Sequence, residues 1–236
     1  MQTLTPKKRE ILERESRILE VARPMVVREG YHGLNMDRIA EEVQYSKGTI
    51  YNHFSCKEEI IIALAIQNVS KRTELFQRAA QFKGCTRHRM VAIGQAAEKF
   101  VRDYPDYFQF EQILQLASVR EKTSEKRQAV IRGCEMQCMS IVAGIVRDAI
   151  AAEDLELPSG FSPEKLVFGL WSLTSGAYSI VFNSDSLEQM GLDDPFETVR
   201  EHTEALLDGY GWSPRSNEYD SEKVLKRIRK EVFSDE

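Results

Sequence analysis

The sequence predicts an all-α protein, and three observations support this prediction. Ala, Glu, Leu, Arg and Gln are abundant, apolar residues recur at helical spacing, and no convincing alternating strand pattern occurs. Glycine and proline lie mostly between the periodic segments. The 236 residues suit one domain, or one domain with a small appendage. We therefore expect about nine helices followed by a C-terminal tail.

The first helix is predicted at about 7–29, where apolar residues recur on one side. Pro24 lies inside this helix and should bend it, because proline removes a backbone hydrogen bond. Gly30 follows the helix, where the chain needs a positive φ. Asn35 and Ser46 predict the starts of the second and third helices, because their side-chain oxygens can accept amide protons of the first turn.

Ser55 is the expected cap of a long fourth helix, which reaches about Phe82 and links the front of the chain to the rest. Turn residues and helix-starting prolines predict five more helices beyond it, and a short tail helix begun by Ser221. The five expected ranges are about 87–103, 105–118, 124–152, 163–182 and 194–210.

Residues 36–54 carry the strongest functional signal, because they are predicted to form two short helices around a tight turn. On the second helix, Ile50 and Phe54 are four residues apart and can pack on the first. The remaining side chains then lie outward, as in a helix-turn-helix that contacts phosphates and base edges in the major groove. The expected DNA-binding residues are Asn35, Met36, Ser46, Lys47, Gly48, Thr49, Tyr51, Asn52, His53 and Lys57.

The charge distribution agrees with a local DNA-binding surface. A net charge of −5 argues against indiscriminate binding of nucleic acid. Residues 1–57 nevertheless contain ten Lys/Arg against eight Asp/Glu, so the excess of cations is at the front of the chain. A three-helix core alone could produce the same apolar pattern, so the helix-turn-helix shape is not sufficient by itself.

The joint pattern resembles the amino-terminal domain of the TetR (tetracycline repressor) family. The resemblance covers about residues 11–64 and rests on the run from Ile39 to Ile60, preceded by Ile18-Leu19, Ala22 and Gly30-Tyr31. Two residues depart from the usual pattern: Asn35 stands where the family often has Thr, and Pro24 stands where a helix former is usual.

The resemblance implies an obligate homodimer that reads a near-palindromic double-stranded DNA operator. It implies a DNA-binding domain at 1–56, a helical ligand-binding and dimerisation domain at 57–212 and a tail at 213–236. It also implies that Thr49, Tyr51, His53 and Lys57 touch phosphates, and that Lys47, Gly48 and Asn52 lie near base edges.

The family also has a ligand cavity between helices of its C-terminal part. Apolar and aromatic residues of the middle helices are the candidates for its lining, although residues of this kind are usually core. They are Phe100, Tyr104, Phe108, Phe110, Leu114, Met136, Met139, Trp171 and Tyr178. The expected effector is a hydrophobic or aromatic small molecule, and no cofactor or metal is expected.

The segment 166–178 is apolar nearly all round, so it must be covered on more than one side. We expect it to pair with the helix that contains Val199 in an isologous contact between two copies. Burial within one monomer is the competing interpretation. The expected interface residues are Phe168, Leu170, Trp171, Leu173, Ala177, Val199, His202 and Leu206.

The four cysteines are too few and too scattered for a disulfide framework, so we interpret them as reduced thiols. Cys134 and Cys138 lie four residues apart, but buried free cysteine explains this better than a metal or redox pair. We find no secretory signal and no apolar stretch near the ~20 residues of a membrane span, and therefore expect a soluble cytoplasmic protein with no membrane partner.

The expected function is a ligand-responsive transcriptional regulator, a repressor that a small effector releases from DNA. An enzyme is not expected, because the sequence has no nucleophile elbow, phosphate loop or metalloprotease spacing. Two alternatives remain: a DNA-binding regulator or architectural protein without small-molecule control, and an all-helical carrier or enzyme whose helix-turn-helix is structural.

Overall fold

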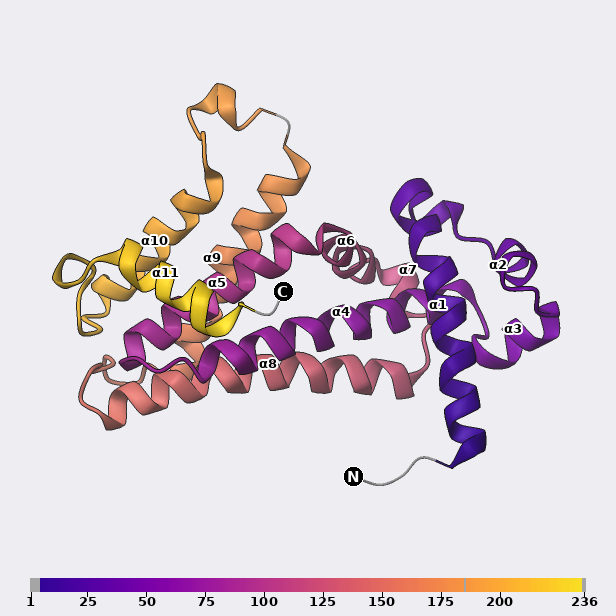
Figure 1. Ribbon diagram of the computed structural model, residues 1–236, viewed down its shortest axis with the longest axis horizontal. Helices are drawn as coiled ribbons and strands as arrows, with labels where there is room; N and C mark the ends of the chain where they lie inside the picture. The colour runs from indigo at the N-terminus through magenta and orange to yellow at the C-terminus, as the bar shows by residue number, and fades with distance from the viewer. Residues whose placement is uncertain (1–4, 185, 235–236) are drawn as a thin grey trace. The chain divides into compact units, whose positions relative to one another are not determined.

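The computed structural model describes residues 5–184 and 186–234, except for the side chains of residues 107 and 108. These residues form helices and no strand, so the predicted all-α fold class is confirmed (Figure 1). The helices are α1 (Pro6–Gly33), α2 (Met36–Val43), α3 (Lys47–His53), α4 (Lys57–Ala80), α5 (Thr86–Asp103), α6 (Pro105–Leu114), α7 (Ala117–Arg120), α8 (Glu125–Ala151), α9 (Pro163–Asn183), α10 (Pro195–Gly209) and α11 (Ser221–Val232), with short 3₁₀ turns at Glu188–Met190 and Ser216–Glu218.

The helices group into two structural units. The first unit contains residues up to 71 and residues 104–134, so it includes α1, α2, α3, most of α4, α6, α7 and the start of α8. The second unit contains residues 72–103 and 135–236. Both α4 and α8 extend from one unit into the other. The predicted domain boundaries after residues 56 and 212 divide the chain by function, and they stay a prediction.

Helix α1 begins at Pro6, close to the predicted start, passes through Pro24 and extends beyond the predicted end to Gly33. The helical conformation is interrupted at Gly30, whose φ of 70° and ψ of −173° confirm the expected positive φ. Inside the helix, Ile18, Ala22 and Met25 are fully buried and lie at helical spacing. This stripe fixes α1 in the core of the first unit.

The predicted end of the helix over 105–118 is wrong. Helix α6 begins with Pro105 in its first turn, as expected, but it stops at Leu114. Leu116 then takes an extended conformation, with φ −66° and ψ 123°, and the short α7 follows. Val119 of α7 is fully buried, so the break in the helix brings this side chain into the core.

A buried guanidinium holds the second unit together. Arg87 of α5 is fully buried and forms ion pairs with Glu204 and with Asp208 of α10, the latter at 2.7 Å. Its guanidinium also donates to the carbonyl oxygen of Trp212 at 2.8 Å. Burying a charge is costly unless its partners compensate. These bonds therefore fix α10, and the segment that follows it, to α5.

The residues after α10 pack on the second unit. The side chain of Trp212 is fully buried, and its indole Nε1 donates to Thr86 Oγ1 at 3.0 Å. The tail helix expected from Ser221 is present as α11 and contacts α5. Its buried side chains are Leu225, Ile228 and Val232.

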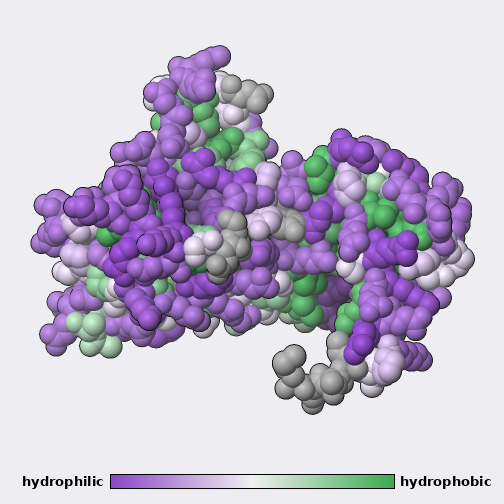
Figure 2. Space-filling model, in the orientation of Figure 1, coloured by the Kyte–Doolittle hydropathy of each residue, from purple (hydrophilic) through white to green (hydrophobic). Residues whose placement is uncertain are grey.

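Among the described residues, the helices α8 and α9 are long and apolar enough to cross a membrane, which corrects the expectation that no apolar stretch approaches a span. Length and composition are weak evidence for a membrane, because a core helix of a soluble protein passes the same test. Only 22% of the apolar window of α9 is buried within the chain. Hydrophobic surface over α9 is visible in Figure 2. The helix therefore presents apolar side chains that need a cover.

Candidate nucleic-acid interface

Both helices of the candidate helix-turn-helix are capped at their starts by side chains. Asn35 Oδ1 accepts the amide protons of Asp37 at 2.8 Å and Arg38 at 3.3 Å, and thus caps α2. Gln44 ends α2 in the left-handed conformation, with φ 59° and ψ 39°. Ser46 Oγ accepts the amide proton of Thr49 at 3.1 Å and caps α3. Both caps confirm the sequence prediction.

The inner face of α3 anchors it to the rest of the first unit. Ile50 and Phe54 are fully buried, and so is Ile39 of α2. Val43 of α2 is buried as well. Because α3 has only seven residues, it would be marginal alone and depends on this packing. The predicted inner face, formed by Ile50 and Phe54, is therefore confirmed.

The outer face of α3 is polar and open to solvent. Lys47, Gly48, Tyr51 and Asn52 are all exposed, and 49% of the Tyr51 surface is accessible. Lys47 Nζ donates to Asp37 Oδ2 at 2.7 Å, and this bond raises the pKa of Lys47. An exposed pair of this kind contributes little to stability. The ammonium can therefore exchange its carboxylate for another anion at small cost.

Gly48 has no structural reason to be glycine within the chain. A Cβ atom built on it would meet only Ser46 Oγ, at 3.8 Å, which is ordinary van der Waals distance. Glycine is also unfavourable inside a helix. Its bare backbone on the exposed face of α3 suits the close approach of a partner.

His53 and Lys57, which are also predicted DNA-binding residues, have partners within the chain as well. The His53 side chain is only 10% exposed, and its Nδ1 lies 3.7 Å from Glu15 Oε1 of α1. Lys57 Nζ donates to the carbonyl oxygen of Tyr31 at 3.1 Å and lies 4.2 Å from the centre of the Tyr31 ring. Helix α4 begins at Lys57, so Cys56, rather than the expected Ser55, precedes it.

A buried carboxylate supports this part of the surface, and the sequence reasoning missed it. Tyr31 Oη donates to Glu58 Oε1 at 2.5 Å, and Lys122 Nζ donates to the same oxygen at 3.2 Å. Burial raises the pKa of Glu58, but these hydrogen bonds outweigh it and lower the pKa to about 2. Burial and the bond to Glu58 raise the pKa of Tyr31 to about 12.

A second buried carboxylate, Glu59, joins the start of α8 to the first turn of α4. Arg127 Nε donates to Glu59 Oε2 at 2.7 Å, and the amide of Ser124 donates to Glu59 Oε1. The Arg127 guanidinium also lies 4.7 Å from the ring centre of Phe54, the residue that ends α3. Glu59 looks in sequence like an ordinary acidic residue of a first helical turn. No local signal connects it to a residue 68 positions away.

The predicted dimer residues of α9 are divided between two environments. Phe168 and Trp171 are exposed, at 58% and 52%, and their rings contact each other edge to face. Leu170 is buried, whereas Leu173 and Ala177 are half-buried. On α10, Val199 is buried, Leu206 is half-buried and His202 is exposed. Phe168 and Trp171 are therefore not buried within the monomer, which was the competing interpretation for this helix.

The predicted ligand-lining residues fall in both structural units, so we place each within its own unit. In the first unit, Phe110 is buried, Tyr104 and Leu114 are half-buried, and the Phe108 side chain lies outside the described residues. In the second, Phe100 and Tyr178 are buried, Met139 is half-buried, and Met136 and Trp171 are exposed. The lining role stays a prediction for all nine.

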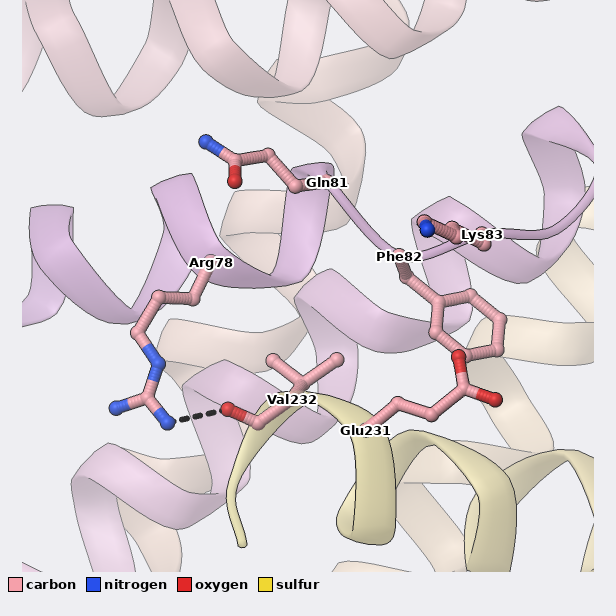
Figure 3. A pocket seen from close by; sticks show the side chains of 6 residues that line it. All are labelled: Arg78, Gln81, Phe82, Lys83, Glu231 and Val232. Atoms are coloured by element: carbon pink, nitrogen blue, oxygen red, sulfur yellow. Dashed lines mark hydrogen bonds between the residues drawn. The ribbon is translucent and has the colours of Figure 1, made fainter. Parts of the chain in front are cut away.

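A pocket of about 460 Å³ in the second unit contains none of these residues (Figure 3). It lies between the end of α4 and the end of α11, where Arg78 donates to the carbonyl oxygen of Val232. Its other lining residues are Gln81, Phe82, Lys83 and Glu231. This lining is mostly polar and charged, unlike the expected hydrophobic effector site.

Cys138 is buried, and its sulfur lies 2.9 Å from Thr73 Oγ1. Cys134 is half-buried, and both residues are free thiols. Over the described ranges, 5–184 and 186–234, no cluster of three His, Cys, Asp or Glu side chains is arranged to hold a metal ion.

Comparison with known proteins agrees with this surface. Residues 18–64 match the family described as bacterial regulatory proteins, tetR family. The chain is 38% identical over 66 residues to the HTH-type transcriptional repressor AcnR of Corynebacterium diphtheriae, which is 28% of this chain and 35% of that protein. It is 32% identical over 89 residues to the HTH-type transcriptional activator FasR of Mycolicibacterium smegmatis, which is 38% of this chain and 41% of that protein. The chain therefore matches well under half the length of these relatives.

The fold likeness extends further along the chain. A crystal structure of a bacterial regulatory protein in the tetR family from Rhodococcus RHA1 superimposes with a TM-score of 0.64, covering 84% of this chain and 97% of that one. The identity is 19%, so this likeness shows the fold alone. The amino-terminal domain of this chain is therefore a tetR-family domain, and the chain has the fold found in a regulatory protein of that family.

Proposed function

We propose that this protein is a ligand-responsive transcriptional regulator, a repressor that binds a near-palindromic DNA operator as a homodimer. The observation that carries the proposal is the outer face of α3. Lys47, Gly48, Tyr51 and Asn52 are exposed on a short helix whose opposite side is buried in the core. A helix presented in this way fits the major groove of DNA.

The proposed contacts divide into two kinds. Lys47, Gly48 and Asn52 approach base edges, whereas Thr49, Tyr51, His53 and Lys57 contact phosphates. Residues at the amino ends of α2 and α3, namely Asn35, Met36 and Ser46, lie where backbone amides can donate to phosphate oxygens. Lys47 and Lys57 exchange their partners in the free protein for phosphates, and each exchange makes binding dependent on salt.

A homodimer accounts for the exposed apolar face of α9. Phe168 and Trp171 together expose a large aromatic surface that isolated solvated residues do not explain. A two-fold axis would place the same residues of a second copy against them. The dimer then presents two copies of α3 to two half-sites, whose centres lie about 34–36 Å apart.

Effector control is the remaining element of the proposal. A small, hydrophobic molecule bound in the C-terminal part would favour a conformation in which the two reading helices no longer match this spacing. Release from the operator follows from that mismatch. The protein would act in the cytoplasm, where its DNA target lies.

The sign of regulation is a separate question, because one relative is named a repressor and another an activator. A promoter fused to a reporter gene distinguishes the two. Deletion of the regulator raises expression if the protein is a repressor and lowers it if the protein is an activator. An architectural DNA-binding protein without effector control would show no copurified ligand in native mass spectrometry of the dimer.

The direct test measures binding of the full chain to the intergenic DNA upstream of its own gene, across a range of salt concentrations. The expected result is tight binding to that DNA, with an affinity that falls as salt rises and a preference of at least about 10³-fold over random DNA. Equal affinity for random DNA, or a flat response to salt, contradicts the proposal.

A further inference from the structure

The amino-terminal part of α1 extends beyond the core of its unit. The helix is started by Thr5, whose Oγ1 accepts the amide proton of Lys8 at 3.4 Å, and by Pro6 in its first turn. All residues from 6 to 14 are exposed, and Glu15 is the first that is half-buried. A helical segment without packing is marginal in water. This exposed stretch with a defined helix start therefore suits a surface that a partner covers.

Three adjacent cations occupy this segment. Lys7, Lys8 and Arg9 are exposed, and within the described part of the chain their side chains form no hydrogen bond or ion pair. The first turn contains no acidic residue. Cations at the amino end of a helix oppose its dipole, so these residues do not serve the stability of α1. Their positive charge is available to an anionic partner.

The segment continues directly into the proposed DNA-reading surface. Arg17 of α1 lies 6.0 Å from the ring centre of Tyr45, in the turn between α2 and α3. Glu15 Oε1 lies 3.7 Å from His53 at the end of α3. Lys7 and Arg17 lie on the same continuous helix, ten residues or nearly three turns apart. At a rise of about 1.5 Å per residue, Lys7 lies roughly 15 Å along the axis from Arg17.

We propose that Lys7, Lys8 and Arg9 bind phosphates of the DNA backbone that flanks each half-site. This inference rests on the proposed function. DNA carries one negative charge per about 1.7 Å of helix axis, so exposed cations that lie beside the duplex find phosphates at short intervals. The three side chains touch phosphates alone, and they add affinity without adding sequence preference.

An anionic lipid surface is the competing partner, because Ile11 and Leu12 are also exposed on this segment. Basic amphipathic helices bind such surfaces. DNA is favoured because the segment is continuous with α1, which contacts both the turn and the end of α3 in the same unit.

The test compares the full chain with the triple variant K7Q/K8Q/R9Q. The matched control is K223Q/K226Q/K230Q, which removes three exposed cations from α11. Operator affinity is measured from 50 to 300 mM salt (roughly the range over which phosphate binding weakens strongly). The K7Q/K8Q/R9Q variant should bind the operator about tenfold or more weakly at low salt. The slope of log affinity against log salt concentration should decrease in magnitude by about 0.9 for each phosphate that is no longer neutralised. The ratio of operator to random-DNA affinity should not change.

A shortened duplex gives an independent readout. Removing the base pairs outside the two half-sites should weaken the binding of the wild-type protein and of the α11 control, but it should leave the affinity of K7Q/K8Q/R9Q unchanged. Equal affinity and slope for wild type and K7Q/K8Q/R9Q on the long operator overturn the inference. If wild type itself does not prefer the operator, the proposed function fails instead.

A vesicle-binding experiment distinguishes DNA from an anionic lipid surface as the partner of this segment. Wild type and K7Q/K8Q/R9Q are mixed with vesicles of phosphatidylcholine containing phosphatidylserine. Lipid binding that depends on the three cations, with DNA affinity unaffected, overturns the inference in favour of a membrane surface. Unchanged helicity by circular dichroism shows that the variant differs only at its surface.

Discussion

The guanidinium of Arg127 lies 4.7 Å from the ring centre of Phe54, while its Nε donates to Glu59. Phe54 is the C-cap of α3, Glu59 belongs to the first turn of α4, and Arg127 belongs to the start of α8. One side chain therefore ties three helices of the first unit together. The planar guanidinium suits both contacts, because it stacks on a ring and donates within its own plane.

Replacement of Arg127 by alanine should lower the free energy of unfolding by about 2 kcal/mol, because it removes the ring contact and leaves a buried carboxylate with one partner fewer. Urea denaturation at fixed protein concentration measures the change. Arg132→Ala is the control, since Arg132 is exposed on the same helix and pairs with Glu125 at the surface. Equal effects of the two replacements would contradict the role of Arg127.

The depressed pKa of Glu58 predicts how the first unit responds to acid. Its pKa is about 2 in the folded protein and near 4.5 when unfolded, so the charged form favours folding. This contribution is present above pH 4.5 and is lost as the pH falls toward 2. Stability should therefore decline over that range, and Glu58→Gln should remove part of the decline. Thermal melting from pH 2 up to neutral pH tests this, with Glu125→Gln as an exposed control. An unchanged pH profile for Glu58→Gln would rule the assignment out.

Tyr51→Ala should weaken operator binding by about tenfold, which is about 1.4 kcal/mol. The melting temperature and the proposed dimer should stay nearly unchanged, because the Tyr51 side chain is half exposed and lies outside the core. Fluorescence anisotropy with labelled operator measures the affinity. Ile50→Ala serves as the comparison, because Ile50 is fully buried. It should lower the free energy of unfolding by about 2–5 kcal/mol. Substantial unfolding of Tyr51→Ala would show that the residue is structural.

Gly48→Ala should separate stability from DNA affinity. The added methyl group meets no closer atom than Ser46 Oγ at 3.8 Å and improves helix propensity. Stability should rise by up to about 1 kcal/mol. Operator affinity, measured by the same anisotropy assay, should fall because the methyl group holds the helix away from the DNA. A variant that is more stable and binds equally well would show that Gly48 does not approach the DNA closely.

If the proposed dimer forms through α9, the double replacement of Phe168 and Trp171 by glutamate should convert it into a monomer, because both side chains are exposed on this helix. Sedimentation velocity measures the mass. Leu116→Glu is a matched control, since Leu116 is 48% exposed but belongs to the first unit. Operator binding should be lost together with the dimer. A variant that keeps the dimeric mass would place the interface elsewhere.

Much of the fold could be predicted from local sequence. The caps at Asn35 and Ser46, the positive φ at Gly30 and the tail helix from Ser221 all depend on neighbouring residues, and the structure confirms them. The break at Leu116 could not be predicted in the same way. The residues around it suit a helix, and the sequence contains no glycine or proline there to mark an end; the structure shows the break together with the burial of Val119.

The same division applies to the candidate site. Helical periodicity alone placed Ile50 inward and Tyr51 outward, because the two faces of a short helix follow from the spacing of its residues. Nothing in the local sequence indicates that Glu59 meets Arg127, or that Glu58 joins Tyr31 and Lys122. These partners lie tens of residues apart, and only the packing of distant helices decides which charges are buried together.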